Sequence, residues 1–152
     1  MIRKLTLALF TGMIATITGN VIAQSTDPAI GVWKTIDDKT NEPASLIKIQ
    51  DVNGALEGTI VKTFQKPNEK PLVYCNLCKD ERKDKPIIGM KIMTELKRDK
   101  PGSWSDGKIL DPEEGEIYRV KIVTEDGKKM DVRGYIGVPL LGRTQVWYKV
   151  EQ

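Results

Sequence analysis

Short apolar runs separated by turn residues fill the chain from Ala29 onward. Most runs alternate apolar and polar residues, which is the two-residue period of a half-buried strand. Asn53-Gly54 and Asp126-Gly127 lie between such runs, and these dipeptides favour two-residue hairpins because they tolerate positive φ. The pattern predicts antiparallel strands joined in sequence order. The predicted strands are 29–36, 45–52, 55–64, 87–96, 104–110, 116–124, 129–136 and 144–150.

About eight strands in this order predict an all-β domain that closes into a small up-and-down barrel. One run, 87–96, is ambiguous, because its apolar spacing fits a strand or a helix. Segment 65–86 interrupts the rhythm with three prolines, both cysteines and a run of mixed charge. We expect 65–86 to be a long cysteine-containing loop whose charged run, 79–85, is solvated.

The N-terminus follows a different pattern. Arg3 and Lys4 precede an uncharged stretch, 5–22, which ends in a Val-x-Ala sequence at Ala23. This is the order of a secretory signal peptide, so we expect cleavage between Ala23 and Gln24. An uncleaved membrane anchor is the alternative, but threonine, glycine and asparagine dilute the apolar stretch.

Cleavage would leave a single domain, residues 24–152, outside the cytoplasm. We expect a periplasmic or secreted protein with no stable membrane anchor after cleavage. The formal net charge of +3 includes Arg3 and Lys4, so the mature chain carries +1. A nearly neutral chain gives no reason to expect nucleic acid or an anionic membrane as a partner.

The sequence has no histidine, which removes the commonest general base and the commonest transition-metal ligand. Its two cysteines, Cys75 and Cys78, are too few for a tetrahedral thiolate metal site. We therefore expect no metal, no cofactor and no enzymatic activity. Cys75-Asn76-Leu77-Cys78 fits a redox pair, but it lacks the strand–helix context of thioredoxin-like motifs. A local disulfide in an oxidising compartment is the favoured interpretation.

Several ordered blocks of residues resemble one bacterial family. Gly31-Val32-Trp33 is similar to the G-x-W signature of lipocalin-like barrels. The other blocks are 107–118, 132–137, 141–147, and the Cys75-x-x-Cys78 pair followed by 86–89. Together they resemble the exported family of unknown function known as domain of unknown function 2147. The resemblance implies a lipocalin- or calycin-like barrel and supplies no established activity or catalytic residue.

The same resemblance suggests which residues close the barrel. Gly31 and Trp33 lie on the first predicted strand, and Trp147 and Lys149 lie on the last. In lipocalins an arginine from the last strand packs on the tryptophan of G-x-W. Here Lys149 stands where the family usually has arginine, and Arg143 is the other candidate for this contact.

Four residues are candidates for ligand contact. Trp104 follows Pro101-Gly102-Ser103 in a predicted loop, so we expect it to be accessible. Tyr118 and Tyr135 offer aromatic surface, and Arg133 offers a charge for a polar head group. The alternative for Arg133 is a solvated outer face of the barrel.

The sequence favours an exported, non-enzymatic binding module for a small apolar or amphipathic ligand. An envelope protein-interaction or structural protein with a filled barrel is the alternative. An envelope thiol redox protein using Cys75 and Cys78 is the third hypothesis. A cavity large enough for a ligand would distinguish the first from the second.

Overall fold

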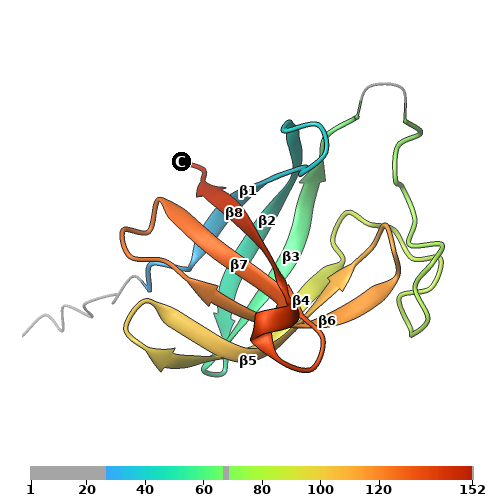
Figure 1. Cartoon of the computed structure of the whole chain (residues 1–152). Helices are drawn as coiled ribbons and strands as arrows, with labels where there is room; N and C mark the ends of the chain where they lie inside the picture. Colours follow the sequence, from blue (N-terminus) through green and yellow to red (C-terminus); the bar gives the residue numbers. More distant parts are fainter. Residues whose placement is uncertain (1–26, 67–68, 152) are drawn as a thin grey trace, which may run out of the picture.

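The structure is a computed structural model that describes residues 27–66 and 69–151. Over these residues, eight antiparallel strands form a closed barrel in which each strand pairs with its neighbours in sequence and β8 returns to β1 (Figure 1). The strands are β1 (Gly31–Ile36), β2 (Pro43–Val52), β3 (Ala55–Thr63), β4 (Lys91–Lys100), β5 (Ser103–Asp111), β6 (Glu116–Val123), β7 (Lys129–Tyr135) and β8 (Arg143–Lys149). The predicted all-β up-and-down barrel is confirmed.

The predicted signal peptide and its cleavage site, Ala23 and Gln24, lie outside the described residues. Within the described ranges, no helix has the length and apolar character needed to cross a membrane.

The run 87–96 forms a strand, but that strand starts four residues later than predicted, at Lys91. Ile87 and Met90 are buried before the strand begins. The N–H of Met90 donates to the carbonyl of Ile87, and Gly89 between them has a φ of 86°. This turn folds the apolar residues inward, so their spacing does not have the two-residue period of a strand.

One end of the barrel is plugged by tryptophan. Trp33 and Trp104 are buried there, and the indole N–H of Trp33 donates to the carbonyl of Ala29 at 2.7 Å. The Arg98 guanidinium lies 5.1 Å from the Trp104 ring and pairs with Asp27. The prediction that Trp104 lies in an accessible loop is wrong. The turn between β4 and β5 contains only residues 101 and 102, so Trp104 already belongs to β5.

The other end of the barrel carries the longer connections. Between β3 and β4, the disulfide of Cys75 and Cys78 packs against the β5–β6 turn, and both cysteines are buried. A Cβ atom on Gly115 would lie 2.0 Å from the Leu77 carbonyl oxygen, which shows how closely the two segments approach. The charged run 79–85 is exposed or half-buried, as expected, whereas the β5–β6 turn covers the two cysteines before it.

Candidate functional site

A cavity of about 640 Å³ opens at the end of the barrel opposite Trp33 and Trp104. Its wall is mainly apolar, with side chains from most strands and from the β3–β4 connection. These are Ile47, Ile60, Leu72, Ile87, Ile92, Ile109, Leu110, Val132 and Trp147. A volume of this size falls in the range of sites for small organic ligands. The barrel is thus plugged at one end and hollow at the other.

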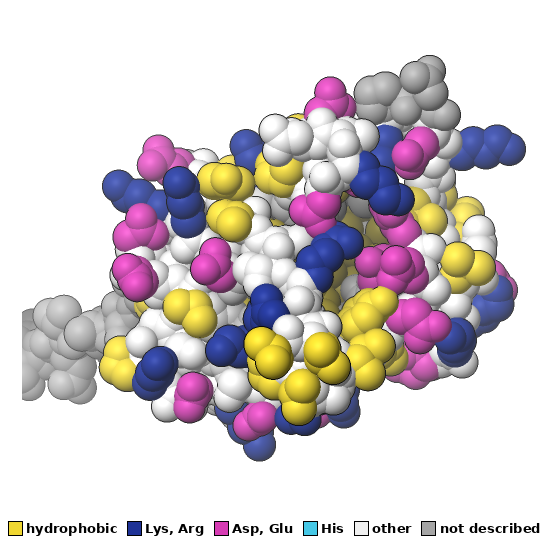
Figure 2. Space-filling model, viewed as in Figure 1, with side chains coloured by type: hydrophobic (Ala, Val, Ile, Leu, Met, Phe, Trp, Pro, Cys, Tyr) yellow, Lys and Arg dark blue, Asp and Glu magenta, His cyan; other side chains and the backbone are white. Residues whose placement is uncertain are grey.

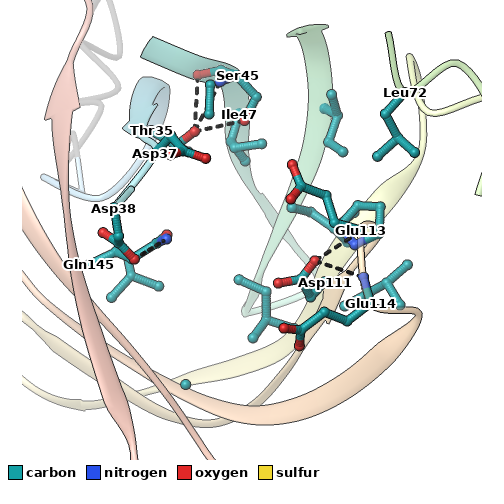
Figure 3. A pocket seen from close by; sticks show the side chains of 18 of the residues that line it. Thr35, Asp37, Asp38, Ser45, Ile47, Leu72, Asp111, Glu113, Glu114 and Gln145 are labelled. Carbon is teal, nitrogen blue, oxygen red and sulfur yellow. Dashed lines mark hydrogen bonds between the residues drawn. The ribbon is translucent and has the colours of Figure 1, made fainter. Parts of the chain in front are cut away.

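Charged side chains surround the mouth of this cavity (Figure 2). Figure 3 shows Asp37 and Asp38 on one side and Asp111, Glu113 and Glu114 on the facing side. Among the described residues that line the cavity there are six carboxylates and four cationic side chains. The carboxylates are Asp37, Asp38, Glu69, Asp111, Glu113 and Glu114, and the cations are Lys39, Lys66, Lys70 and Arg143.

Lys66 joins three parts of this rim. Its Nζ lies 2.8 Å from Asp37 after β1, 2.7 Å from Glu113 in the β5–β6 turn, and 3.8 Å from Glu69. Hydrogen bonding to Lys66 holds the pKa of the Asp37 carboxyl below its usual range. Desolvation opposes the charge on Lys66, but the bonds to Asp37 and Glu113 outweigh it and raise the Lys66 pKa. The ammonium is therefore already neutralised by protein carboxylates.

The β5–β6 hairpin brings a carboxylate, Asp111, and a phenol, Tyr118, to the cavity. The Asp111 carboxylate accepts the backbone N–H groups of Glu113 and Glu114 at 2.9 and 3.3 Å, which makes it a turn-stabilising residue. Burial raises the Asp111 pKa. The Tyr118 hydroxyl donates to Glu114 Oε2 at 2.6 Å, and this bond to a carboxylate raises the Tyr118 pKa to about 12.

The four predicted ligand residues do not all meet at the cavity. Tyr118 and Tyr135 line it, although the Tyr135 ring also lies 5.6 Å from the Arg119 guanidinium. Trp104 does not line it, because it is buried at the plugged end. Arg133 does not line it either, because residues alternate along β7 and the neighbouring Val132 faces inward.

Arg133 instead braces the connection between β7 and β8 on the outside of the barrel. Its Nε donates to the Pro139 carbonyl at 2.6 Å, Nη1 to the Thr144 hydroxyl at 2.8 Å and Nη2 to the Leu140 carbonyl at 3.3 Å. Every nitrogen of the guanidinium is therefore engaged, by the β7–β8 connection or by Thr144 at the start of β8. The proposed contact between Arg133 and a ligand head group has no geometric support.

Three of the proposed closure residues meet where β1 pairs with β8. Trp33 is the register partner of Lys149, whose Nζ lies 4.6 Å from the Trp33 ring. Gly31 makes room for this lysine, because a Cβ atom there would lie 2.7 Å from Lys149 Cε. Desolvation lowers the Lys149 pKa. Arg143, the other candidate, pairs with Asp38 at the mouth.

Trp147 has a different position from the other closure residues. It pairs with Met130 of β7 and contributes to the cavity wall, and its indole N–H donates to Gln145 Oε1 at 3.2 Å. Within residues 27–66 and 69–151, no three histidine, cysteine, aspartate or glutamate side chains are grouped so that they could hold a metal ion.

Lys66, Asp37 and Glu113 were not predicted as rim residues from the sequence. Their types alone gave no signal, since charged residues in turns are normally solvated. The topology, in contrast, offered a signal. In an up-and-down barrel, the odd-numbered connections all lie at the same end. Charges after β1, after β3 and between β5 and β6 must therefore be neighbours.

The hollow, plugged barrel with a G-x-W tryptophan under the β1–β8 seam is a lipocalin-like structure. The sequence model of a family described as "Uncharacterized protein conserved in bacteria (DUF2147)" matches residues 31–149, and the chain belongs to this family. Among solved structures, protein HP1028 from the human pathogen Helicobacter pylori, described as belonging to the lipocalin family, is similar at a TM-score of 0.70. That match has 15% sequence identity and covers 82% of this chain and 84% of the other, so it shows the shared fold. No curated protein matches the chain.

Proposed function

We propose that this protein is an exported, non-enzymatic binding protein that holds a small amphipathic molecule in its barrel. The observation that carries the proposal is the cavity of about 640 Å³ with an apolar wall and a charged rim. Apolar walls bury the carbon surface of a ligand, while a few polar groups at the entrance orient it. The lipocalin-like fold supports a binding role.

The rim favours a ligand whose polar end is a cation or a neutral hydrogen-bond donor. Carboxylates outnumber cations around the mouth by six to four among the described lining residues. The least exposed of these cations, Lys66, is already paired with Asp37 and Glu113. A carboxylate ligand would have to displace one of these acidic partners, whereas an amine would meet acceptors.

The two alternative functions have less support. A barrel filled by side chains does not agree with a cavity of this size. A thiol redox role requires sulfur atoms that a partner can reach. Here both cysteines are buried, and Cys75 Sγ lies 3.7 Å from the Pro112 carbonyl oxygen.

Export is part of the same proposal. The basic head and the Val-x-Ala end of residues 1–23 support cleavage before Gln24. A disulfide between Cys75 and Cys78 is in keeping with an oxidising compartment. Intact-mass analysis of the exported protein should find a chain starting at Gln24, and finding Met1 instead would contradict export by cleavage.

The binding proposal is tested by titrating the protein with alkyl amines and with fatty acids of matched chain length. Trp147 lines the cavity, so its fluorescence should respond saturably to the amines and more weakly to the acids. Val132→Phe should abolish the response, because the added ring enters the cavity. Val146→Phe is the matched control, since Val146 lies on the neighbouring strand and is partly exposed. Equal responses of the two variants would contradict the proposed site.

A further inference from the structure

The connection between β7 and β8 exposes an unusual amount of apolar surface. Residues 136–142 read Ile-Gly-Val-Pro-Leu-Leu-Gly and contain no charge. Ile136, Val138, Leu140 and Leu141, which we call the apolar tip, are 70, 53, 85 and 78% exposed. Figure 2 shows hydrophobic side chains gathered below the hollow, where Figure 1 places this connection. Contiguous exposed apolar residues usually mark an interaction surface.

The tip is held in this exposed position by hydrogen bonds. The N–H groups of Leu141 and Gly142 donate to the carbonyls of Val138 and Pro139, both at 3.1 Å, within a short 3-10 turn. The Arg133 guanidinium also donates hydrogen bonds to the carbonyls of Pro139 and Leu140. The backbone is therefore organised to present these side chains outward.

The apolar tip is continuous with the cavity. Ile136 and Leu141 line the cavity and are at the same time among the most exposed side chains of the tip. An apolar surface thus leads from solvent, over the tip, into the barrel. A molecule with an apolar tail could move along it without exposing the whole tail to water.

We propose that the apolar tip inserts into the surface of a zwitterionic phospholipid bilayer and places the barrel mouth against it. This inference rests on the proposed function, since it describes how an amphipathic ligand would enter or leave. A connection of seven residues is short for a protein interface, which takes about 20–30 residues from each partner. A few apolar side chains are enough for insertion at a membrane surface.

The charge around the mouth selects the kind of membrane. The rim carries more carboxylates than cations among its described residues, so a strongly anionic surface would repel it. The tip itself is uncharged. Adsorption should therefore depend on apolar insertion and should change little between low and high salt.

Co-sedimentation of residues 24–152 with phosphatidylcholine vesicles tests the inference. The double variant Leu140→Asp, Leu141→Asp should lower the partition coefficient by roughly tenfold or more, since two apolar side chains of the inserting tip become charged. Val52→Asp is the matched control, because Val52 is exposed at the opposite end of the barrel and should leave binding unchanged. Replacing a third of the lipid with phosphatidylglycerol should not strengthen binding.

The same experiment separates this inference from the proposed function. Val132→Phe should lose the amine response yet sediment with vesicles as the unsubstituted protein does. As an independent measurement, Leu140→Trp should show a blue shift in emission on adding vesicles. The inference is overturned if the unsubstituted protein stays in the supernatant, or if Val52→Asp reduces binding as much as the tip variant does. It is also overturned if the tip variant only dissociates a dimer, which would assign the tip to a second copy of the chain.

Discussion

Lys66 and Asp37 form an ion pair of 2.8 Å that connects the start of the β3–β4 connection to the end of β1 across the barrel mouth. Both side chains are largely buried, at 14 and 13% exposure, so water screens the pair only in part. Glu113 completes the cluster from the third side. An ion-pair cluster therefore links three separate segments of the rim at one end of the barrel.

The ion pair should contribute to stability. Lys66→Met should lower the free energy of unfolding by about 1–3 kcal/mol, because it leaves Asp37 without its charged donor. Urea unfolding measures this change. Lys48→Met is the control, since Lys48 is exposed on β2 and should unfold like the unsubstituted protein.

The pH dependence of that contribution follows from the two pKa shifts. Because folding lowers the Asp37 pKa, the stabilisation is complete above the pKa of the unfolded chain, about 4. This stabilisation is lost as the pH falls through the pKa of Asp37 in the folded protein. Because folding raises the Lys66 pKa, the stabilisation is complete below the pKa of the unfolded chain, about 10. It is lost as the pH rises through the pKa of Lys66 in the folded protein. The difference in stability between the Lys66→Met variant and the unsubstituted protein should thus be constant from pH 5 to about 9. A difference that already shrinks between pH 7 and 5 would contradict the pairing.

Trp33 should be essential to the plugged end. Trp33→Ala should destabilise the fold by about 3–5 kcal/mol, as deletion of a large buried aromatic does. It also removes the surface beneath the Lys149 ammonium. Thermal unfolding measures the loss, and Tyr148→Ala serves as control because Tyr148 is partly exposed on the same strand as Lys149. An unchanged midpoint for Trp33→Ala would show that Trp33 is not a core plug.

Tyr118 should titrate later than an ordinary tyrosine. Its hydroxyl donates to Glu114, and the pKa is raised to about 12. Glu114→Gln removes the negative charge and should bring the pKa back toward 10. Ultraviolet titration at alkaline pH, compared with Tyr118→Phe to assign the transition, measures both values. If Glu114→Gln leaves the late transition in place, the bond to Glu114 is not its cause.

The disulfide should stabilise the fold without acting in catalysis. The ring closed by Cys75 and Cys78 is short, so the chain-entropy estimate of its contribution is only about 2 kcal/mol. The double variant Cys75→Ser, Cys78→Ser should lower the free energy of unfolding by about this amount and leave the barrel folded. Rapid reduction of insulin by the reduced protein would contradict the structural role.

The sequence was informative where local rules decide the structure. Asn53-Gly54 predicted a two-residue hairpin, and β2 and β3 form it. Asp126-Gly127 also lies in a hairpin, but the prediction that it is tight is wrong, because the connection between β6 and β7 has five residues, 124–128. The closing strand followed from the resemblance of Gly31-Val32-Trp33 to the G-x-W signature. Positions were harder to predict where the face of the strand decides whether a side chain points inward or outward. Trp104 was predicted in a loop but lies in the core, because the β4–β5 turn is only two residues long. Arg133 was predicted to contact a ligand but faces outward, because its neighbour Val132 faces inward.

The cavity itself could not be predicted from the sequence. Whether a small barrel is hollow depends on the total volume of the inward-facing side chains from all the strands. No single residue indicates that volume. The cluster of Lys66, Asp37 and Glu113 likewise forms only after three separate connections meet at one end of the barrel. Their separation along the chain hides the contact from any local pattern.

Native mass spectrometry of the protein purified from its native source detects a bound ligand directly. We predict a population heavier than the polypeptide by the mass of one small amphipathic molecule. Val132→Phe should remove that population, while Val146→Phe should retain it. A spectrum with only the bare polypeptide for all three proteins, together with no saturable response to the amine series, would contradict a ligand-carrying barrel.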